Sequence, residues 1–431
     1  MILGICVAYL GGEMSDDVHF TRVSTDTRTL RPGDLFVALP GAQFDANTFA
    51  EEAERKGASA VVVSRPVDVS IPTVVTDDTL AWYQGLAHFA IRRNHQRVIG
   101  VTGSNGKTTT KDMIAAVLGT RYRVHKTEAN HNNEIGLPRS VLAADETDEI
   151  LVLEMGIERP DEMPDLTAIA APEIAVITSI GDAHLENFDS KYGIADEKTR
   201  IVVPDVTKEL FVNGDDAILT EVLAQKSLPA HEVHAADAEI HTIAPLSFTY
   251  RGVDFHLAVA GRHHLTNALL AIEVGRAFGV SLEDASRALE SAELTPMRGA
   301  ILEGHHTVLD CSYKSNPESV RASIDTLLSM PGRHVAVLGD MLGLGASSHA
   351  LHAEVGRSIP SDVTLFTFGD EANAFAEDFH GEHRPFGNDV DALTRALLAL
   401  PHANVLVQAS RALRGERIVD ALRAHEESND R

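Results

Sequence analysis

Cysteine is scarce in this sequence, with only Cys6 and Cys311 among 431 residues. Two cysteines allow at most one disulfide bridge, so a disulfide-stapled secreted fold is excluded and a reducing compartment is favoured. The sequence also lacks an apolar run of about 20 residues, which a membrane-spanning helix requires. A secretory signal needs a lysine or arginine before its apolar stretch, and none precedes the apolar stretch at this N-terminus. We therefore expect a cytoplasmic protein without membrane insertion.

Positive charge is also in short supply. Lysine and arginine total 37 and aspartate and glutamate total 63, which gives a formal net charge of −26. Nucleic-acid grooves and surfaces for anionic membranes need clustered positive charge, so this balance argues against both kinds of partner. It does not exclude a phosphorylated ligand, because backbone N–H groups and a few well-placed cations can bind phosphate locally.

Apolar patterning divides the chain into three segments, within the two to four domains that its length favours. Residues 1–96 carry short β-like runs around a polar helical stretch and predict a small α/β domain. Residues 97–297 carry continuous apolar runs, which are typical of strands buried on both faces of a mainly parallel sheet. Within them, residues 209–260 alternate more and predict an antiparallel flap at the sheet edge. In residues 298–431 the strand–helix rhythm restarts and predicts a Rossmann-like domain.

A glycine-bearing turn lies between an expected strand and an expected helix at residues 103–109. Backbone N–H groups in such a turn and at the following helix N-terminus bind phosphate. Lys107 is placed to reach the outer phosphates and Thr108 to ligate Mg²⁺. Val101 stands where the strict phosphate-loop pattern has its first glycine, and a helix cap that binds nothing is the alternative interpretation. The candidate nucleotide-binding residues are Gly103, Ser104, Asn105, Gly106, Lys107, Thr108 and Thr109.

Two more polar residues follow neighbouring expected strands. Glu154 ends the run EILVLE, and His184 comes shortly after the run EIAVITS. Open α/β sheets place their sites at the carboxyl ends of the strands, so this pair could hold a second metal ion or orient water around the first. Either residue alone could be structural. Lys198 lies in a polar helical stretch, and by composition it is a solvated surface lysine.

Five motifs along the chain resemble those of the Mur ligases, ATP-dependent enzymes that form amide bonds in the peptide of the peptidoglycan precursor. They stand in the family's order: TGSNGKTTTK (102–111), NHNNEIGLP (130–138), LEMG (153–156), GDAHLENF (181–188) and IADEKTRI (194–201). The resemblance covers almost the whole chain. It implies that residues 1–96 bind a uridine-diphosphate substrate, that residues 97–297 form a central ATPase domain with a phosphate loop, and that residues 298–431 form the Rossmann-like domain.

The resemblance also implies roles for single residues. Lys107, His184 and Lys198 would be catalytic, with Lys198 carrying a carbamate that bridges to a second Mg²⁺. Thr108 and Glu154 would join His184 and Lys198 as metal ligands. Asn267 would contact adenine, and Arg298 would face the ATP from the last domain. The implied substrate-binding residues are Ser24, Thr25, Asp26 and Asn47 in the first domain, Asn133 in the central cleft, and Tyr313 and Asn316 in the last domain.

The chain departs from the family pattern at three places. Cys311 and Lys314 stand where the family usually has Asp and Asn, ahead of Asn316. Gln408 replaces the usual lysine of a Lys-Gly-Ser-Arg motif, and Asn47 replaces a histidine. These changes fall mostly where the second substrate and the last domain's contacts with ATP are expected.

Within the family, the first and last segments are most similar to the members that add D-alanyl-D-alanine to UDP-N-acetylmuramoyl-tripeptide. The resemblance therefore implies a monomeric ligase that uses ATP and Mg²⁺ and passes through an acyl phosphate. One alternative is a ligase of the same fold with another substrate pair, such as one adding a single amino acid or a folyl-polyglutamate-type enzyme. Others are a regulatory ATPase without ligase activity and an inactive family member.

Overall fold

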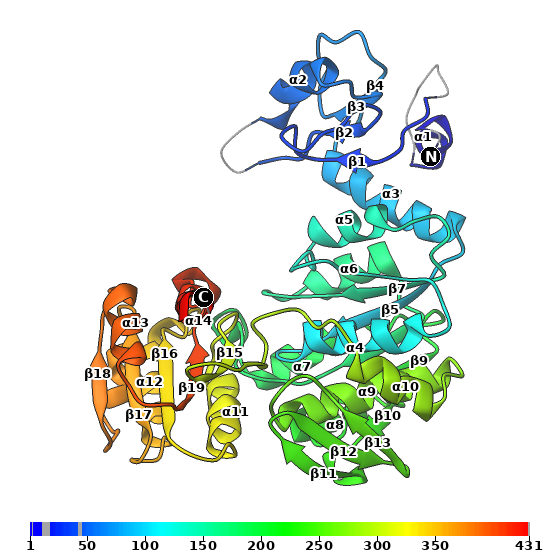
Figure 1. The fold of residues 1–431 in the computed structure, drawn as a ribbon. Coiled ribbons are helices and arrows are strands. Elements are labelled where there is room, and N and C mark those ends of the chain that lie inside the picture. The colour runs from blue at the N-terminus through cyan, green and yellow to red at the C-terminus, as the bar shows by residue number, and fades with distance from the viewer. Residues whose placement is uncertain (2, 11–17, 42–44, 430–431) are drawn as a thin grey trace.

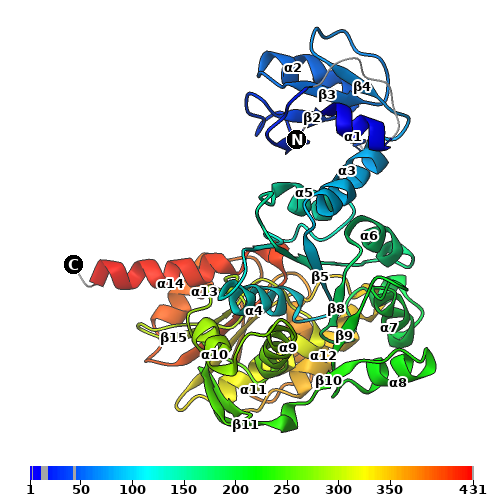
Figure 2. The same ribbon diagram turned by 90° about the vertical axis from the view of Figure 1, so that its right-hand side faces the viewer.

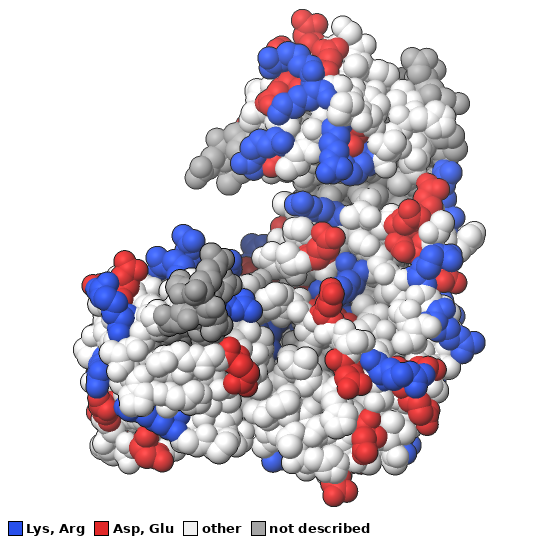
Figure 3. All heavy atoms as spheres, viewed as in Figure 1, with Lys and Arg blue, Asp and Glu red and all other residues white. Residues whose placement is uncertain are grey.

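Three α/β domains make up the chain in a computed structural model that describes residues 1, 3–10, 18–41 and 45–429. The central domain carries the N-terminal domain at one end and the C-terminal domain at its side (Figure 1). The surface is hollowed between the two outer domains, and acidic and basic side chains are interspersed over this face (Figure 3). Within the described ranges, no helix combines the length and the apolar character needed to cross a membrane.

The N-terminal domain is built on a sheet of four parallel strands in the order β1-β2-β3-β4. Successive side chains of a strand point to opposite faces, and here both faces are covered by apolar residues. This explains why the sequence shows short unbroken apolar runs in this segment. The elements are α1 (Leu3–Leu10), β1 (Val23–Ser24), β2 (Leu35–Val37), α2 (Ala50–Arg55), β3 (Ala60–Val63) and β4 (Thr73–Val75).

Helix α3 (Thr79–Arg93) belongs to two cores at once. Asp78 caps its N-terminus by accepting a hydrogen bond from the backbone N–H of Ala81. Trp82 packs in the core of the N-terminal domain, whereas Ile91, further along the helix, packs in the core of the central domain. Figure 2 shows the helix running from one domain to the other. The first two domains are therefore joined by a continuous helix rather than by a loop.

The central sheet has six parallel strands in the order β10-β9-β8-β5-β7-β6. Helices α4, α9 and α10 supply apolar side chains to the core on one face, and α5, α6 and α8 to the core on the other. Helix α7 packs between α6 and α8. The strands are β5 (Arg97–Thr102), β6 (Val124–Lys126), β7 (Ile150–Glu154), β8 (Ile174–Ile177), β9 (Glu209–Asn213) and β10 (His231–Val233). The helices are α4 (Lys107–Gly119), α5 (Gly136–Ala143), α6 (Glu162–Ala170), α7 (Lys191–Thr199), α8 (Ala217–Gln225), α9 (His263–Ala277) and α10 (Leu282–Glu290).

The prediction of an antiparallel flap over residues 209–260 is wrong for its first part. Strands β9 and β10 are parallel members of the central sheet. Only β11 (Ala238–Ile243), β12 (Leu246–Tyr250) and β13 (Val253–His256) pair antiparallel, as a separate three-stranded sheet. Phe248 and Phe255 of this small sheet pack into the same core as α4 and α9. The small sheet therefore covers the helices that pack on one face of the central sheet.

The C-terminal sheet has six strands in the order β14-β15-β19-β16-β17-β18, and only β14 at its edge runs antiparallel. Helices α11 and α12 pack on one face and α13 and α14 on the other, so the predicted α/β alternation is confirmed. The strands are β14 (Ala300–Leu302), β15 (Thr307–Cys311), β16 (His334–Gly339), β17 (Thr364–Phe368), β18 (His383–Pro385) and β19 (Asn404–Gln408). The helices are α11 (Pro317–Leu328), α12 (Ser348–Arg357), α13 (Val390–Leu398) and α14 (Glu416–Asn429).

Candidate active site

The chain passes from β5 into α4 through a loop with two glycines at which any side chain would be strained. Gly103 and Gly106 have φ angles of +148° and +83°, which residues with a side chain rarely adopt. A Cβ atom on Gly103 would lie 1.9 Å from Thr178 Oγ1, and one on Gly106 would lie 2.5 Å from Asn267 Oδ1. The loop backbone is therefore in close contact with the end of β8 and with α9.

A cleft of about 500 Å³ opens where this loop, the ends of β7 and β8, the start of α9 and the C-terminal domain meet. We call it the interdomain cleft. Its walls carry cations from both domains and carboxylates as well. The predicted site residues that line it are Ser104, Asn105, Gly106, Lys107, Thr108, Thr109, Glu154, His184, Asn267, Arg298 and Tyr313.

Thr108 and Glu154 form a pair of oxygen donors at the floor of the cleft. The Thr108 hydroxyl donates a hydrogen bond to Glu154 Oε2 at 2.7 Å, and Asn132 Nδ2 donates to Oε1 at 2.9 Å. Hydroxyl and carboxylate oxygens are the ligands that Mg²⁺ prefers. Among the described residues, no group of three or more histidine, cysteine or acidic side chains could hold a metal alone. Mg²⁺ at this pair would therefore take its other ligands from phosphate and water, as it usually does.

Lys198 is 3% exposed, so the prediction of a solvated lysine from composition is wrong. Helix α7 turns Ile194, Ala195 and Lys198 inward, and Glu197 on the same buried side accepts a hydrogen bond from the backbone of Met163. Burial holds the pKa of Lys198 well below its usual range, and the charges of Lys107 and Lys314 lower it further. The Lys198 ammonium makes no hydrogen bond or ion pair within the part of the chain that the structure describes.

Lys107 and His184 face the cleft from the loop and from the segment after β8. Lys107 Nζ donates to the carbonyl of Gly103 at 2.6 Å, and burial lowers its pKa. Burial, followed by the charges of Lys314, Lys107 and Lys198, lowers the pKa of His184 to about 4. The imidazole is therefore neutral at physiological pH and keeps a lone pair for a metal ion.

Asn267 and Arg298 also line the cleft. The buried Asn267 amide donates to His264 Nδ1 at 3.3 Å. The Arg298 guanidinium lies over the ring of Tyr313, 4.2 Å from its centroid, and its buried Nε has no hydrogen-bond partner among the described residues. Both side chains thus have polar atoms near the cleft that make few hydrogen bonds within the described parts of the protein.

The C-terminal domain touches the phosphate loop directly, through contacts that sequence reasoning missed. Lys314 Nζ donates to the carbonyl of Ser104 at 2.8 Å, and Asn316 Nδ2 donates to Asn105 Oδ1 at 2.9 Å. Asn316 also caps the N-terminus of α11. The pattern Asn-Pro-Glu-Ser at residues 316–319 signals such a cap in the sequence, but not the domain that it meets.

A carboxylate of the same segment strengthens this docking. Glu318 Oε1 accepts a hydrogen bond from the backbone N–H of Asp182 at 3.1 Å and lies 3.2 Å from Lys191 Nζ, which also pairs with the Asp182 carboxylate.

Cys311, at the end of β15, is buried, and burial raises the pKa of its thiol to about 12. It has no thiolate character at neutral pH.

The remaining predicted substrate residues lie away from the cleft. Ser24 is the last residue of β1 and Thr25 follows it. Asp26 pairs with Arg28, which lowers the pKa of the Asp26 carboxyl to about 2. The buried Asn47 amide bonds internally to Asp45 and Ser64. Asn133 is exposed, and its Oδ1 accepts hydrogen bonds at the start of α5.

Family models match along most of the chain. The Mur ligase family catalytic domain matches residues 19–122, the Mur ligase middle domain matches residues 101–275, and the Mur ligase glutamate ligase domain matches residues 297–424. The three matches follow the order of the domains described above.

Full-length relatives resemble the chain in sequence and in structure. The UDP-N-acetylmuramoyl-tripeptide–D-alanyl-D-alanine ligase of Bacillus subtilis (strain 168) is 37% identical over 427 residues, covering 93% of this chain and 92% of its own. A crystal structure of MurF from Acinetobacter baumannii is similar with a TM-score of 0.87 and 29% identity over 97% of both chains. The MurF ligase of Thermotoga maritima in complex with ADP has a TM-score of 0.85 and 28% identity, covering 96% of this chain and all of its own.

The neutral imidazole of His184 gives a prediction for pH. In the folded protein His184 should take up a proton only near pH 4, whereas in the unfolded chain it should do so near its ordinary value of about 6.5. The unfolded state then binds the extra proton as pH falls through this window, so His184 lowers the stability of the fold there. NMR of ¹³C-labelled histidine, assigned with a His184→Gln variant, measures both titrations. A folded-state pKa near 6.5 would contradict the buried, cation-flanked environment.

Proposed function

This chain belongs to the Mur ligase family, and we propose that it joins D-alanyl-D-alanine, or a similar D-dipeptide, to UDP-N-acetylmuramoyl-tripeptide at the expense of ATP. The product would be a precursor of peptidoglycan. The observation that carries the proposal is the similarity over nearly the whole chain to ligases of that name. We further propose that the enzyme works as a monomer in the cytoplasm.

The three segments divide the work in this proposal. Residues 97–297 bind ATP, with its phosphates on the loop at residues 103–109 and its adenine near Asn267. The ADP complex of the Thermotoga maritima relative supports binding of an adenine nucleotide, though not its position. Residues 1–96 hold the uridine nucleotide beside Ser24, Thr25 and Asp26. Residues 298–431 present the dipeptide near Tyr313 and Asn316.

The first chemical step activates the tripeptide's carboxylate. An oxygen of that carboxylate attacks the γ-phosphorus of ATP, the bond from this phosphorus to the β,γ-bridging oxygen breaks, and ADP leaves with the electron pair. Two anions must approach each other, so Lys107 neutralises charge on the transferring phosphoryl group. Thr108 and Glu154 would hold Mg²⁺, which when bound would supply further charge neutralisation on the phosphate oxygens.

The second step forms the amide. The amine of the dipeptide attacks the carbonyl carbon of the acyl phosphate, and the tetrahedral adduct expels phosphate and loses a proton. Water would hydrolyse the acyl phosphate if it reached the cleft. The contacts of Lys314 and Asn316 with the loop place the C-terminal domain over the phosphate loop, where it limits access of water.

Lys198 and His184 form the second metal site in this proposal. Burial lowers the pKa of Lys198 and so favours its neutral amine, the form that can add to CO₂ and lose a proton to give a carbamate. Such a carbamate would add anionic oxygens to the neutral His184 imidazole, and this donor set would suit a second Mg²⁺ that binds the acceptor carboxylate.

The reaction is tested by measuring phosphate release and amide formation with matched substrates. UDP-N-acetylmuramoyl-tripeptide with ATP, Mg²⁺ and D-alanyl-D-alanine should give one new amide for each phosphate. The UDP-linked dipeptide precursor with single amino acids should give neither. Amide formation only with single amino acids would reject the substrate assignment, and ATP hydrolysis without any amide would favour a regulatory ATPase.

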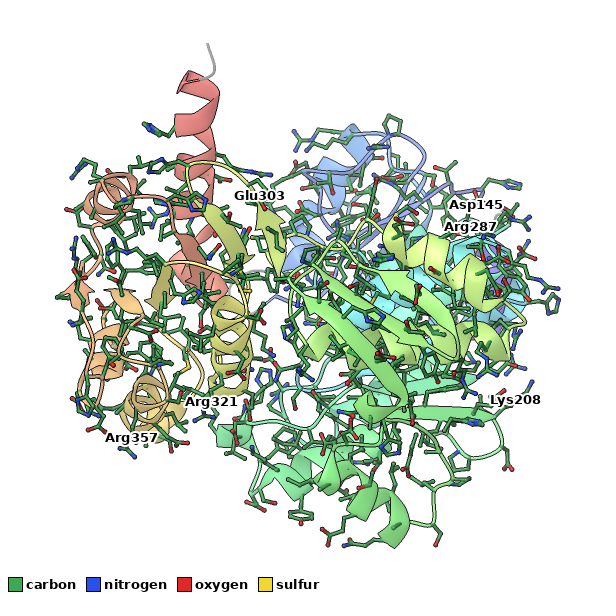
Figure 4. The ribbon with its side chains drawn as sticks, turned by 60° about the horizontal axis from the view of Figure 1, so that its bottom comes forward. Asp145, Lys208, Arg287, Glu303, Arg321 and Arg357 are labelled. Atoms are coloured by element: carbon green, nitrogen blue, oxygen red, sulfur yellow. The ribbon has the colours of Figure 1, made fainter. Side chains whose placement is uncertain are left out.

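Lys198 should be essential, and a surface lysine of the same domain serves as its control. Lys198→Met keeps a similar volume but cannot carry a carbamate, so kcat should fall at least about 100-fold, the range for removing a group that stabilises transition-state charge. Lys208 lies at the periphery of the central domain in an exposed pair with Glu173, so Lys208→Met should retain full activity (Figure 4). In ¹³CO₂-equilibrated enzyme, a carbamate signal should appear in the wild type and be absent from Lys198→Met. Full activity of Lys198→Met would refute the second site.

A further inference from the structure

We propose that Lys314, which reaches the phosphate loop from the C-terminal domain, is a second lysine ligand of the γ-phosphate of ATP beside Lys107. The inference rests on the proposed use of ATP in the interdomain cleft. It assigns a specific binding role to a residue at which this chain departs from the family pattern. The observations that carry it are the position of the ammonium, the absence of an ion pair to it among the described residues, and the contacts that fix its backbone.

The position of the Lys314 ammonium is set by the loop itself. Nζ donates a hydrogen bond of 2.8 Å to the carbonyl oxygen of Ser104, and the side chain lines the cleft together with Lys107. Ser104 immediately precedes the turn of Asn105 and Gly106 into α4. The N–H groups of this turn can bind a phosphate. Such a phosphate would lie near the Lys314 ammonium, because Lys314 contacts the residue just before the turn.

The cations around Lys314 favour the binding of an anion beside it. Lys314 forms no ion pair with any carboxylate in the described parts of the chain, and neither does Lys107. Burial, then the charges of Lys107 and Arg298, lower the pKa of Lys314 to about 7. The charges of Glu154 and Glu318 act in the opposite direction but do not offset this effect, and neither carboxylate forms an ion pair with Lys314. A polyphosphate would stabilise the cluster by pairing with several of these cations at once.

Two hydrogen bonds fix the backbone that carries Lys314. Gln408 Nε2, at the end of β19, donates to the carbonyl of Lys314 at 3.1 Å and to Ser319 Oγ at 3.0 Å. Two residues further on, Asn316 bonds to Asn105 of the loop. The backbone of Lys314 is therefore held in place beside the cleft. This lowers the conformational entropy that the residue loses when it binds a ligand.

Gln408 marks a second position on this wall of the cleft that could carry a cation. Gln408 and Lys314 both line the cleft, and the Gln408 amide contacts the Lys314 backbone. At each position the chain differs from the family pattern, which has lysine at 408 and asparagine at 314. The two differences together keep one lysine on this wall and move it to the segment that touches the phosphate loop.

The proposal is tested by comparing the affinities for ATP and ADP, in Mg²⁺ and without the other substrates. Lys314→Asn should weaken ATP by about 10-fold or more, because a charge-assisted contact with the γ-phosphate is lost. ADP lacks that phosphate, so its affinity should change less than about twofold. Isothermal titration calorimetry measures both, and thermal unfolding confirms that the variant is folded.

Three further variants sharpen the result. Lys314→Arg retains the cation and should keep most of the preference for ATP over ADP. The double variant Lys314→Asn/Gln408→Lys returns a cation to the adjacent position and should recover part of it. Arg321→Gln removes an exposed cation of α11 that pairs with Glu354 and should bind both nucleotides like the wild type (Figure 4).

An equal loss of ATP and ADP affinity in Lys314→Asn, or no loss of either, would overturn the proposal. So would an unchanged ratio of the two affinities combined with a raised KM for the dipeptide, since Lys314 would then bind the dipeptide's carboxylate. A wild-type chain that binds ATP but forms no amide would refute the proposed reaction, while the comparison of ATP with ADP would still decide the role of Lys314.

Discussion

Close packing of one loop against its neighbours organises the site. The backbone at Gly103 and Gly106 lies so near Thr178 and Asn267 that a single added carbon would clash. The end of β8 and the start of α9 are therefore fixed relative to the loop, and β7 is tied to it through Thr108 and Glu154. With the loop in place, each functional side chain at the carboxyl ends of the central strands has a defined distance to a bound phosphate.

The second feature is a concentration of positive charge inside an acidic protein. The chain carries a net charge of −26, yet the charges of Lys107 and Lys314 lower the pKa of Lys198, and the charge of Lys107 lowers the pKa of Lys314. Desolvation is the largest cause for each of them. A low-dielectric pocket in which Lys107 and Lys314 have no ion pair among the described residues binds a polyanion strongly, and exposed acidic side chains compete little because salt screens their charges. Ligand binding and domain docking are thereby linked, since Lys314 comes from the other domain.

Much of this could be predicted from the sequence because parallel sheets and phosphate loops leave local signals. Continuous apolar runs predicted the central and C-terminal sheets, and the strand–turn–helix context predicted the loop at residues 103–109. The burial of Lys198 could not be predicted from composition, since it depends on which face of α7 meets the rest of the domain. The contact of Lys314 with Ser104 joins residues 210 positions apart across a domain boundary, and no local pattern encodes it. For the same reason the short strand β9 could be recognised as a strand while its partners could not.

The central claim is that the acceptor carboxylate is phosphorylated before the amide forms, and one oxygen atom tests it most directly. If the tripeptide's terminal carboxylate is labelled with ¹⁸O, the acyl phosphate carries a labelled bridging oxygen that leaves with the phosphate. Mass spectrometry of the released phosphate should therefore find one ¹⁸O atom for each amide formed. Amide formation with no ¹⁸O in the phosphate would contradict the account.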